Sequence, residues 1–309
     1  MNRRNVLAAK RWRLEMRSRI LHGMRLFFVE RGFMEVQTPV RTPAPAPERH
    51  IDAVRSEDRY LQTSPELYMK RLLAAGYDKI FQICPVFRRG ERGRRHHPEF
   101  TLLEWYRLGA DYEALKADCR DLLQAVCAYV GRFPRFSYGA HLLSVLPPWE
   151  HWTVRDIFLE RAGWDPFQSY DTDRFTEDLV EKIEPALGFP APAFLSDYPP
   201  EEAALARLRH HGDVTVAERF ELYWAGIELA NGFSELTDRR EQENRFQECL
   251  ARRREEGRDV YPWPQRFLES LDDLEAAAGI ALGVDRLVML LTDASSMDEV
   301  TAFEPEHEP

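Results

Sequence analysis

The sequence predicts an α+β fold, a single domain over residues 1–309 in which helices flank a largely antiparallel sheet. Three observations favour this class. Strand-like and helix-like segments are mixed along the chain without regular βαβ alternation. The hydrophobic fraction, 44%, is sufficient for a sizeable buried core. The chain also lacks the GxGxxG and GxxxxGK(S/T) patterns, which argues against Rossmann and P-loop nucleotide sites.

The N-terminal part predicts a long helix followed by a short strand. Over residues 6–32 apolar side chains recur near helical spacing, and Gly32 ends the pattern. Residues 33–39 predict a strand that ends at Pro39, because proline cannot donate a ladder hydrogen bond. Residues 42–47 alternate proline with small residues and predict an extended loop.

A helix start and two strands follow. Ser64 is a predicted N-cap, with Pro65 at the first helical position and Glu66 in the first turn. Residues 79–85 and 100–106 predict strands that flank an arginine-rich loop, and residues 111–132 predict a helix.

The second half of the chain has weaker signals. Prolines break up residues 152–212, which predict a helical insertion made of short helices. Residues 220–235 predict a β segment interrupted by Asn231-Gly232. The remaining predictions are charged helices over 239–256 and 264–278, a glycine-spaced segment over 279–283 and a closing helix over 284–291.

The arginine-rich loop has the composition of a phosphate site. Seven cationic or titratable side chains lie within ten residues: Arg88, Arg89, Arg92, Arg94, Arg95, His96 and His97. Fixed guanidinium groups bind phosphate oxygens bidentately, so this loop suits a polyphosphate. A β-hairpin with a solvated basic tip is the alternative interpretation.

The strand after this loop adds groups that suit a base and an amine. Phe100 offers an aromatic face on which a base could stack. Glu104 and Tyr106 point to one face of the strand, because side chains alternate there. An acid beside a phenol suits an ammonium group.

An acidic pair predicts a metal site. A two-residue type I′ turn at Asn231-Gly232 would place Glu228 directly opposite Glu235. Like charges opposed at a Cβ separation of roughly 5 Å are destabilising. Mg²⁺, however, commonly takes one or two carboxylates together with substrate phosphates. The pair therefore favours Mg²⁺ over the alternative of two solvated acids on a hairpin.

Residues 279–292 predict a backbone that a ligand approaches closely. Small residues recur at Gly279, Ala281 and Gly283. Arg286 lies in the first turn of the following helix, where a cation gains nothing from the helix dipole. An anionic or aromatic partner is therefore expected, the alternative being a buried turn with an incidental arginine.

Together these segments resemble the three motifs of class II aminoacyl-tRNA synthetases. Motif 1 is matched over about 11–40, motif 2 over about 80–107 and motif 3 over about 279–292. The lysyl branch is the most similar, through SPELYMKRLL at 64–73, HPEFTLLEWY at 97–106 and ELANGFSELTD at 228–238.

The resemblance implies a role for each matching residue. Arg88 would hold the α-phosphate and the substrate carboxylate, while Phe100 and Arg286 would sandwich adenine. The implied ATP contacts are Arg88, Arg89, Gly90, His96, His97, Phe100, Glu228, Leu229, Gly283 and Arg286. The implied substrate contacts are Ser64, Pro65, Glu66, Glu104, Tyr106, Glu235 and Ala281. Glu228 and Glu235 would hold Mg²⁺ and act in catalysis with Arg88 and Arg286, and motif 1 implies a homodimer.

Two features point to one relative of the lysyl branch, the elongation factor P–(R)-β-lysine ligase family. Only about ten residues precede the motif 1 helix, where lysyl-tRNA synthetases carry an anticodon-binding domain. Ser64 and Ala281 stand where those synthetases tend to have Ala and Gly. The resemblance implies activation of (R)-β-lysine or lysine as an adenylate and its transfer to a lysine of elongation factor P. Gly90 and His97 depart from the family pattern, which usually has Glu and Asn there.

Charge and hydropathy restrict the other classes. The net charge of −10 argues against tRNA as the main partner, because nucleic-acid-binding proteins usually carry a basic face. No membrane span or signal-peptide core is found, so a cytoplasmic enzyme is expected. Two rival hypotheses are a truncated lysyl-tRNA synthetase-like enzyme that charges tRNA and a non-catalytic regulatory paralogue.

Overall fold

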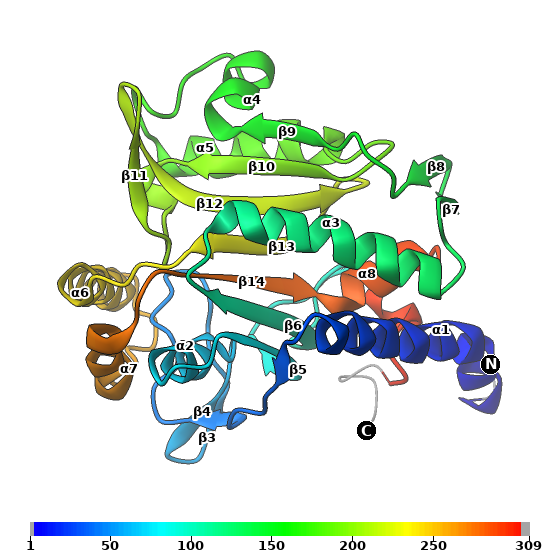
Figure 1. Cartoon of the computed structure of the whole chain (residues 1–309), viewed down its shortest axis with the longest axis horizontal. Coiled ribbons are helices and arrows are strands. Elements are labelled where there is room, and N and C mark those ends of the chain that lie inside the picture. The colour runs from blue at the N-terminus through cyan, green and yellow to red at the C-terminus, as the bar shows by residue number, and fades with distance from the viewer. Residues whose placement is uncertain (1–2, 304–309) are drawn as a thin grey trace.

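The computed structural model describes residues 3–303 and confirms the α+β class (Figure 1). The main sheet has nine strands: β1 (Met34–Glu35), β5 (Lys79–Phe87), β6 (Glu99–Leu108), β9 (Glu150–Thr153), β10 (Ala193–Tyr198), β11 (Leu208–His211), β12 (Val214–Trp224), β13 (Ile227–Ser234) and β14 (Ala277–Gly283). They lie in the order β1-β5-β6-β14-β13-β12-β10-β9, with β11 paired to β12. The pairs β1–β5 and β9–β10 are parallel and the others antiparallel, as a largely antiparallel sheet requires.

Helices surround this sheet. Within residues 3–303 the α-helices are α1 (Arg3–Glu30), α2 (Glu66–Ala74), α3 (Tyr112–Tyr129), α4 (Val154–Arg161), α5 (Thr172–Asp178), α6 (Arg239–Glu255), α7 (Gln265–Ser270) and α8 (Val284–Leu291). Short 3-10 or π segments occupy 179–186, 200–202, 271–273 and 297–299. Two small sheets combine β2 (Arg41–Thr42), β3 (Arg55–Ser56) and β4 (Arg59–Leu61), and β7 (Arg135–Tyr138) with β8 (His141–Ser144).

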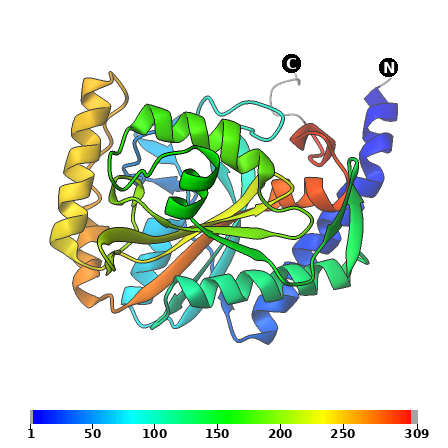
Figure 2. The same ribbon diagram turned by 90° about the horizontal axis from the view of Figure 1, so that it is seen from above.

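Helices α1, α3 and α8 cover one face of the sheet and build the main core (Figures 1 and 2). Helix α1 places Ile20, Met24 and Phe28 on this face at helical spacing, and all three are fully buried. The Phe28 ring stacks on Phe81 of β5, with ring centroids 4.8 Å apart. Each side chain buried in this way contributes about 1.5–3 kcal/mol to stability. Because the core lies on this face, the opposite face remains available for a ligand site.

The first half of the chain follows the predicted elements closely. The helices predicted at 6–32 and 111–132 are confirmed as α1 and α3, and the two strands of motif 2 as β5 and β6. The strand predicted at 33–39 is wrong beyond Glu35. Thr38 N donates to the Gln82 side chain at 3.1 Å rather than to a neighbouring strand, and Pro39 has no N–H to donate.

The helix start predicted at Ser64 is displaced by one residue. Ser64 Oγ accepts a hydrogen bond from Glu66 N at 3.0 Å, as an N-cap side chain does. Helix α2 nevertheless begins at Glu66, and Pro65 is its N-cap residue with φ −78° and ψ 0°.

The turn predicted at Asn231-Gly232 is wrong, because both residues lie inside β13. The β12–β13 hairpin turns instead at Ala225 and Gly226, whose φ angles of 54° and 67° are the positive pair that a type I′ turn requires. Glycine is required at position 232 by close packing, because a Cβ there would lie 2.8 Å from the Ile280 side chain and 3.0 Å from the Phe220 ring.

Two further predictions need correction. The helix predicted at 264–278 ends near Asp273, and Ala277 and Ala278 belong to β14, where they pair with β6. The insertion at 152–212 is helical at α4 and α5, but it also contains β10 and β11. Strand β10 pairs with β9 on one side and β12 on the other, so its apolar residues are buried in a sheet rather than in a helix.

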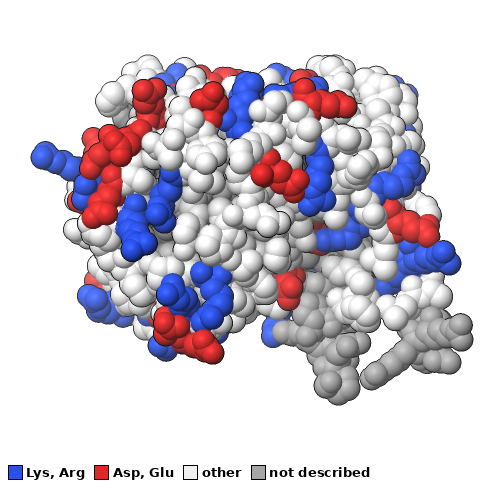
Figure 3. Space-filling view, turned by 60° about the horizontal axis from the view of Figure 1, so that its bottom comes forward, with Lys and Arg blue, Asp and Glu red and all other residues white. Residues whose placement is uncertain are grey.

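The surface carries charges of both signs. Acidic and basic side chains are interspersed over the face shown in Figure 3. No helix within residues 3–303 is long and apolar enough to cross a membrane.

Candidate active site

A cavity of about 1080 Å³ opens on the sheet face opposite the main core. It brings together most of the residues predicted from the sequence: Ser64, Glu66, Arg88, His96, His97, Phe100, Glu104, Tyr106, Glu228, Leu229, Ala281, Gly283 and Arg286. Four predicted residues do not line it. Pro65 is the N-cap residue of α2, Glu235 is fully buried, and Arg89 and Gly90 lie outside the cavity, where Arg89 contacts Asp259 at 2.9 Å.

Strand register explains how distant segments meet in this cavity. Directly paired residues of neighbouring strands point to the same sheet face. One row of paired residues runs across five strands: Glu221, Asn231, Ala281, Glu104 and Gln82. The adjacent row contains Arg219, Phe233, Gly279, Tyr106 and Ile80. The floor of the cavity is therefore a polar patch on an otherwise apolar sheet.

One end of the cavity is built for a cationic group. Ser64 Oγ donates to Glu104 Oε1 at 2.6 Å, and Tyr106 Oη donates to Glu104 Oε2 at 2.8 Å. Burial, together with the charge of the nearby Glu66, raises the pKa of Glu104 to about 7, although these two hydrogen bonds act in the opposite direction. A positive group entering this end would restore the ionised carboxylate.

Lys70 is a buried residue of this end that the sequence analysis did not single out. Its Nζ donates to Glu66 Oε1 at 2.6 Å and forms an ion pair with Glu235, and its side chain is fully buried. Burial raises the pKa of Glu235 to about 8, although Lys70 acts in the opposite direction. One lysine thus faces three acids (Glu66, Glu104 and Glu235), which leaves a deficit of positive charge. The helical spacing of Glu66 and Lys70, four residues apart, is the signal that could have identified the pair.

The other end of the cavity is built around Glu228. A bulge in β13 at Leu229 shifts the register, so that Glu228 pairs with Tyr223 and points to the same face as Asn231. Arg286 donates to Glu228 O at 2.8 Å and to Glu228 Oε2 at 3.1 Å. Burial opposes ionisation of Glu228, but Arg286 and the more distant Arg219 outweigh it and lower the pKa. Arg286 therefore has the anionic partner that its position in α8 predicted.

The acid that the strand register places beside Glu228 is Glu221, not Glu235, so the geometry of the predicted metal pair is wrong. Glu228 lies at the start of β13 and Glu235 directly follows its last residue, so the strand rise per residue separates them by roughly 20 Å. Two carboxylates at that separation cannot share an ion. Glu221 lies on β12 beside Glu228, and burial and the charge of Glu228 raise its pKa against the effect of Arg219. Glu221 could not be predicted as the partner because a turn at Asn231-Gly232 lies six residues beyond the true turn.

The donors at Glu221 and Glu228 fit a magnesium ion that also binds phosphate. Among the described residues, no cluster of three or more His, Cys, Asp or Glu side chains could hold a metal. Two carboxylates with the rest of the shell left to water and phosphate is the arrangement that Mg²⁺ prefers in nucleotide sites.

Motif 2 places a cation and an aromatic ring between the two ends. The Arg88 guanidinium carbon lies 5.1 Å from the centroid of the Phe100 ring. Arg286 reaches the same loop, since it contacts His96 Nε2 at 2.6 Å. His97 is turned toward Asp298, with Nε2 2.8 Å from the carboxylate. The arrangement offers guanidinium groups to a phosphate chain between an ammonium site and a carboxylate pair.

Comparison with known proteins identifies the class. Residues 4–307 match the family model described as tRNA synthetases class II (D, K and N), so the fold is that of a class II synthetase-like ligase, a class that uses ATP. The chain is 38% identical to the elongation factor P–(R)-beta-lysine ligase of Vibrio vulnificus and 40% identical to those of Vibrio atlanticus and Vibrio cholerae, over 94% of each chain. The chain belongs to this family of elongation factor P–(R)-beta-lysine ligases.

Proposed function

We propose that this protein activates (R)-β-lysine or lysine with ATP and transfers the acyl group to a lysine side chain of elongation factor P in the cytoplasm. The observation that carries the proposal is the pairing of an acid-rich pocket with a guanidinium-lined nucleotide region in one cavity. The names of its relatives supply the acceptor and the amino acid.

The amino-acid end accounts for a diamine substrate. Glu66, Glu104 and Glu235 carry three potential negative charges, and Lys70 neutralises one of them. The remaining two match the two ammonium groups of lysine or β-lysine. We propose that Ser64, Tyr106 and Ala281 shape this end around the substrate chain, with Pro65 fixing the start of α2.

The nucleotide end accounts for adenylate formation. Arg88 would hold the substrate carboxylate and the α-phosphate together, so that the carboxylate oxygen attacks phosphorus and pyrophosphate leaves. Phe100 and Arg286 would hold the adenine, with backbone contacts from Leu229 and Gly283. These groups act by positioning and by stabilising charge, which is the largest source of catalysis for such reactions. Mg²⁺ held by Glu221 and Glu228 would neutralise phosphate charge.

A homodimer is part of the proposal. Around motif 1, exposed large apolar side chains include Leu7, Trp12, Leu26, Val29, Met34 and Val40. Exposed apolar residues that form a contiguous patch mark association surfaces, and the proposed dimer requires these residues to do so. Light scattering of the purified protein at micromolar concentration is expected to give twice the chain mass of 36.2 kDa.

The function is tested by the intact mass of elongation factor P after incubation with this protein, ATP–Mg²⁺ and either lysine isomer. A gain of one lysyl unit, faster with the β isomer, is the expected result. Arg88→Ala should abolish the gain and the lysine-dependent exchange of pyrophosphate into ATP while leaving the thermal unfolding curve unchanged. Exchange without modification would point to another acceptor such as tRNA, and absence of exchange in the unmutated protein would support a non-catalytic paralogue.

A further inference from the structure

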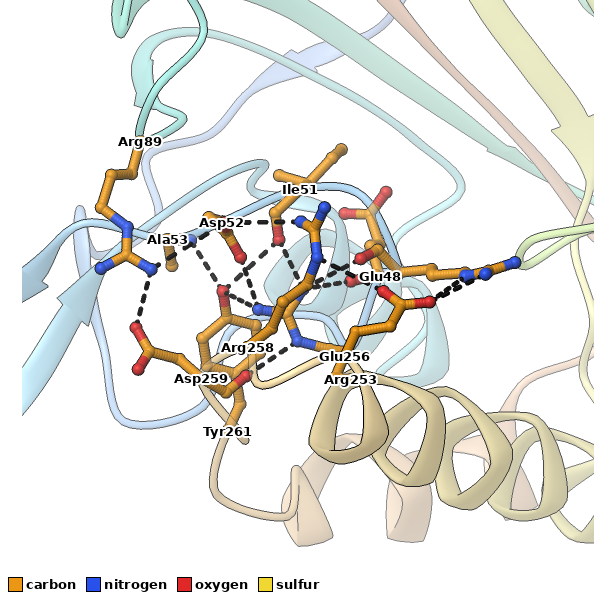
Figure 4. Close-up of polar contacts among 11 residues, drawn as sticks. Glu48, Ile51, Asp52, Ala53, Arg89, Arg253, Glu256, Arg258, Asp259 and Tyr261 are labelled. Atoms are coloured by element: carbon orange, nitrogen blue, oxygen red, sulfur yellow. Dashed lines mark hydrogen bonds and ion pairs between the residues drawn. The ribbon is translucent and has the colours of Figure 1, made fainter. Parts of the chain in front are cut away.

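Residues 48–53 form a segment that α6 holds against the cavity (Figure 4). Arg253 of α6 is fully buried, and its guanidinium donates to the carbonyl oxygens of Glu48 at 2.7 Å, Arg49 at 3.3 Å and Ile51 at 3.0 Å. The same group donates to the Asp52 carboxylate at 2.6 Å. One side chain thus contacts four of the five residues 48–52, a stretch that has no helix or strand of its own.

Further hydrogen bonds tie the segment to its surroundings. Tyr261 Oη accepts from Arg253 at 2.9 Å and from Ala53 N at 2.8 Å. Asp52 O accepts from Arg89 N at 2.6 Å, directly next to Arg88 of the cavity. The position of the segment relative to motif 2 is therefore set by buried polar contacts, which lowers its conformational freedom before any ligand binds.

This anchoring presents the Glu48 side chain to the cavity. Glu48 lines the cavity with Glu66 and Arg88, and within residues 3–303 its carboxylate accepts no hydrogen bond and forms no ion pair. The charges that act on it belong to Arg88 and Glu91 of the motif 2 region, Glu66 of α2 and Arg219 of β12. On α6 it faces Cys249, whose pKa it helps to raise.

The role of Glu48 is not filled by the groups already described. The three acids Glu66, Glu104 and Glu235 are gathered around Lys70 and Tyr106 at the amino-acid end. Among the cations that act on Glu48, Arg88 has the largest effect, and Arg88 is the group assigned to the substrate carboxylate. After activation the carbon of that carboxylate is the acyl carbon that an acceptor attacks, and Glu48 lines the same cavity as Arg88.

We propose that Glu48 is a catalytic residue of the transfer step, the base that receives the proton of the incoming acceptor amine. The inference rests on the proposed function, since it needs the acyl-adenylate. The acceptor ammonium gives one proton to the Glu48 carboxylate, and the freed nitrogen lone pair attacks the acyl carbon. The C–N bond forms, the bond from carbon to the phosphate oxygen breaks, and AMP departs. The nitrogen passes its second proton to the departing phosphate, which leaves a neutral amide.

The environment of Glu48 suits such a base. Burial raises its pKa to about 7, against the lowering effect of Arg88 and with a further raise from Glu66. A base is most effective when its pKa lies near the working pH. The fixed backbone at Arg253 makes the position reproducible, with Arg253 acting as a positioning residue.

The test separates the two half-reactions in the Glu48→Gln variant. Lysine-dependent pyrophosphate exchange should stay within about threefold of the unmutated protein. Single-turnover transfer of the acyl group from pre-formed, enzyme-bound adenylate to elongation factor P should fall by about 100-fold or more, the usual effect of losing a general base. The unmutated transfer rate should rise with pH through about 7, where Glu48 ionises, and the variant should lose this inflection.

Glu201→Gln is the matched control, because it removes an exposed acid from the wall of the same cavity; transfer and exchange should both be unchanged. Normal transfer by Glu48→Gln, or an equal loss of exchange and transfer, would overturn the inference and leave the proposed function standing. Absence of exchange in the unmutated protein would overturn both.

Discussion

Gly279 of β14 lies directly opposite Tyr106 of β6, and the phenol ring fills the space where a side chain would begin. A Cβ at position 279 would lie 2.1 Å from Tyr106 Cε1 and 2.4 Å from Glu235 Oε1. The glycine is thus required by close packing at the amino-acid end. Because Gly279 has no side chain, the Tyr106 ring and the Glu235 carboxylate can both lie next to its Cα.

Gly279→Ala is expected to remove lysine-dependent pyrophosphate exchange, because Tyr106 must leave its place beside Glu104. Overpacking of this kind should also lower the free energy of unfolding by about 1–3 kcal/mol, which urea denaturation would measure. In the control Gly93→Ala, the nearest neighbouring atom to the new Cβ lies 4.0 Å away, so exchange should persist. Full activity of Gly279→Ala would contradict the packing argument.

Glu221 and Glu235 should differ in their effects on magnesium. Glu221→Gln is expected to increase the Mg²⁺ concentration for half-maximal pyrophosphate exchange by about tenfold or more, because second carboxylates of this kind fix the ion beside phosphate. Glu235→Gln should leave the Mg²⁺ dependence unchanged and increase the KM for lysine. A magnesium shift in Glu235→Gln and none in Glu221→Gln would restore the pair predicted from the sequence.

Lysine binding should weaken as the pH falls from 8.5 to 6.5. In the free protein burial raises the pKa of Glu235 to about 8 and that of Glu104 to about 7. Both groups must lose their protons to face ammonium groups, so binding releases protons. The affinity should fall by on the order of ten- to a hundredfold over this range. Calorimetry in buffers of different ionisation enthalpy checks the proton release; pH-independent affinity would refute it.

The same shifts set the sign of a stability effect in the free protein. A carboxyl whose pKa is higher in the folded than in the unfolded state contributes stability that is full below its unfolded value, 4.5, and is lost as pH rises through the folded value. Added lysine should therefore increase the melting temperature more at pH 8.5 than at pH 6. An equal increase at both values would mean that these acids are not at the binding site.

Arg253→Met should be among the most destabilising substitutions of α6. It removes the buried guanidinium from the Asp52 carboxylate and from four carbonyl groups, and breaking such a pair costs about 3–5 kcal/mol. Arg258→Met is the control, because Arg258 is partly exposed and lies 3.5 Å from the same carboxylate. It should cost less than about 1 kcal/mol. Equal losses in urea denaturation would show that the network of Figure 4 does not depend on burial.

Local patterns predicted most of the fold. Helical spacing in α1, the arginine-rich loop between β5 and β6, and the closing helix α8 are local signals, and each lies where the sequence indicated. The turn predicted at Asn231-Gly232 is wrong although an Asn-Gly pair is a strong turn signal by itself. Its glycine is needed because Ile280 and Phe220 press on it from neighbouring strands, and no local pattern reveals that contact.

The residues of the candidate site could be predicted where they lie close together in the sequence. Glu104 and Tyr106 share a strand, so alternation alone brought them together. Glu221 was missed because the turn was predicted six residues too late. For Lys70, Glu66 lies one helical turn away in α2 and is a local signal, but its second partner, Glu235, comes from a distant part of the sequence. Burial decides which acids have a raised pKa in the folded protein. That burial depends on tertiary packing, which the spacing of residues in the sequence does not reveal.

The bulge at Leu229 lets β13 serve two sites, the nucleotide region near Glu228 and the amino-acid end near Glu235. Without the extra residue, Glu228 would turn to the helix-covered side and the nucleotide region would lose its acid, while Glu235 would stay in place. The nucleotide end and the amino-acid end of β13 can therefore change independently of each other. Substitutions around Glu235, Ala281 and Ser64 can change which amino acid is bound as substrate, while the residues at the other end still bind ATP. A scaffold of this kind can diversify its substrates by mutation at one end only.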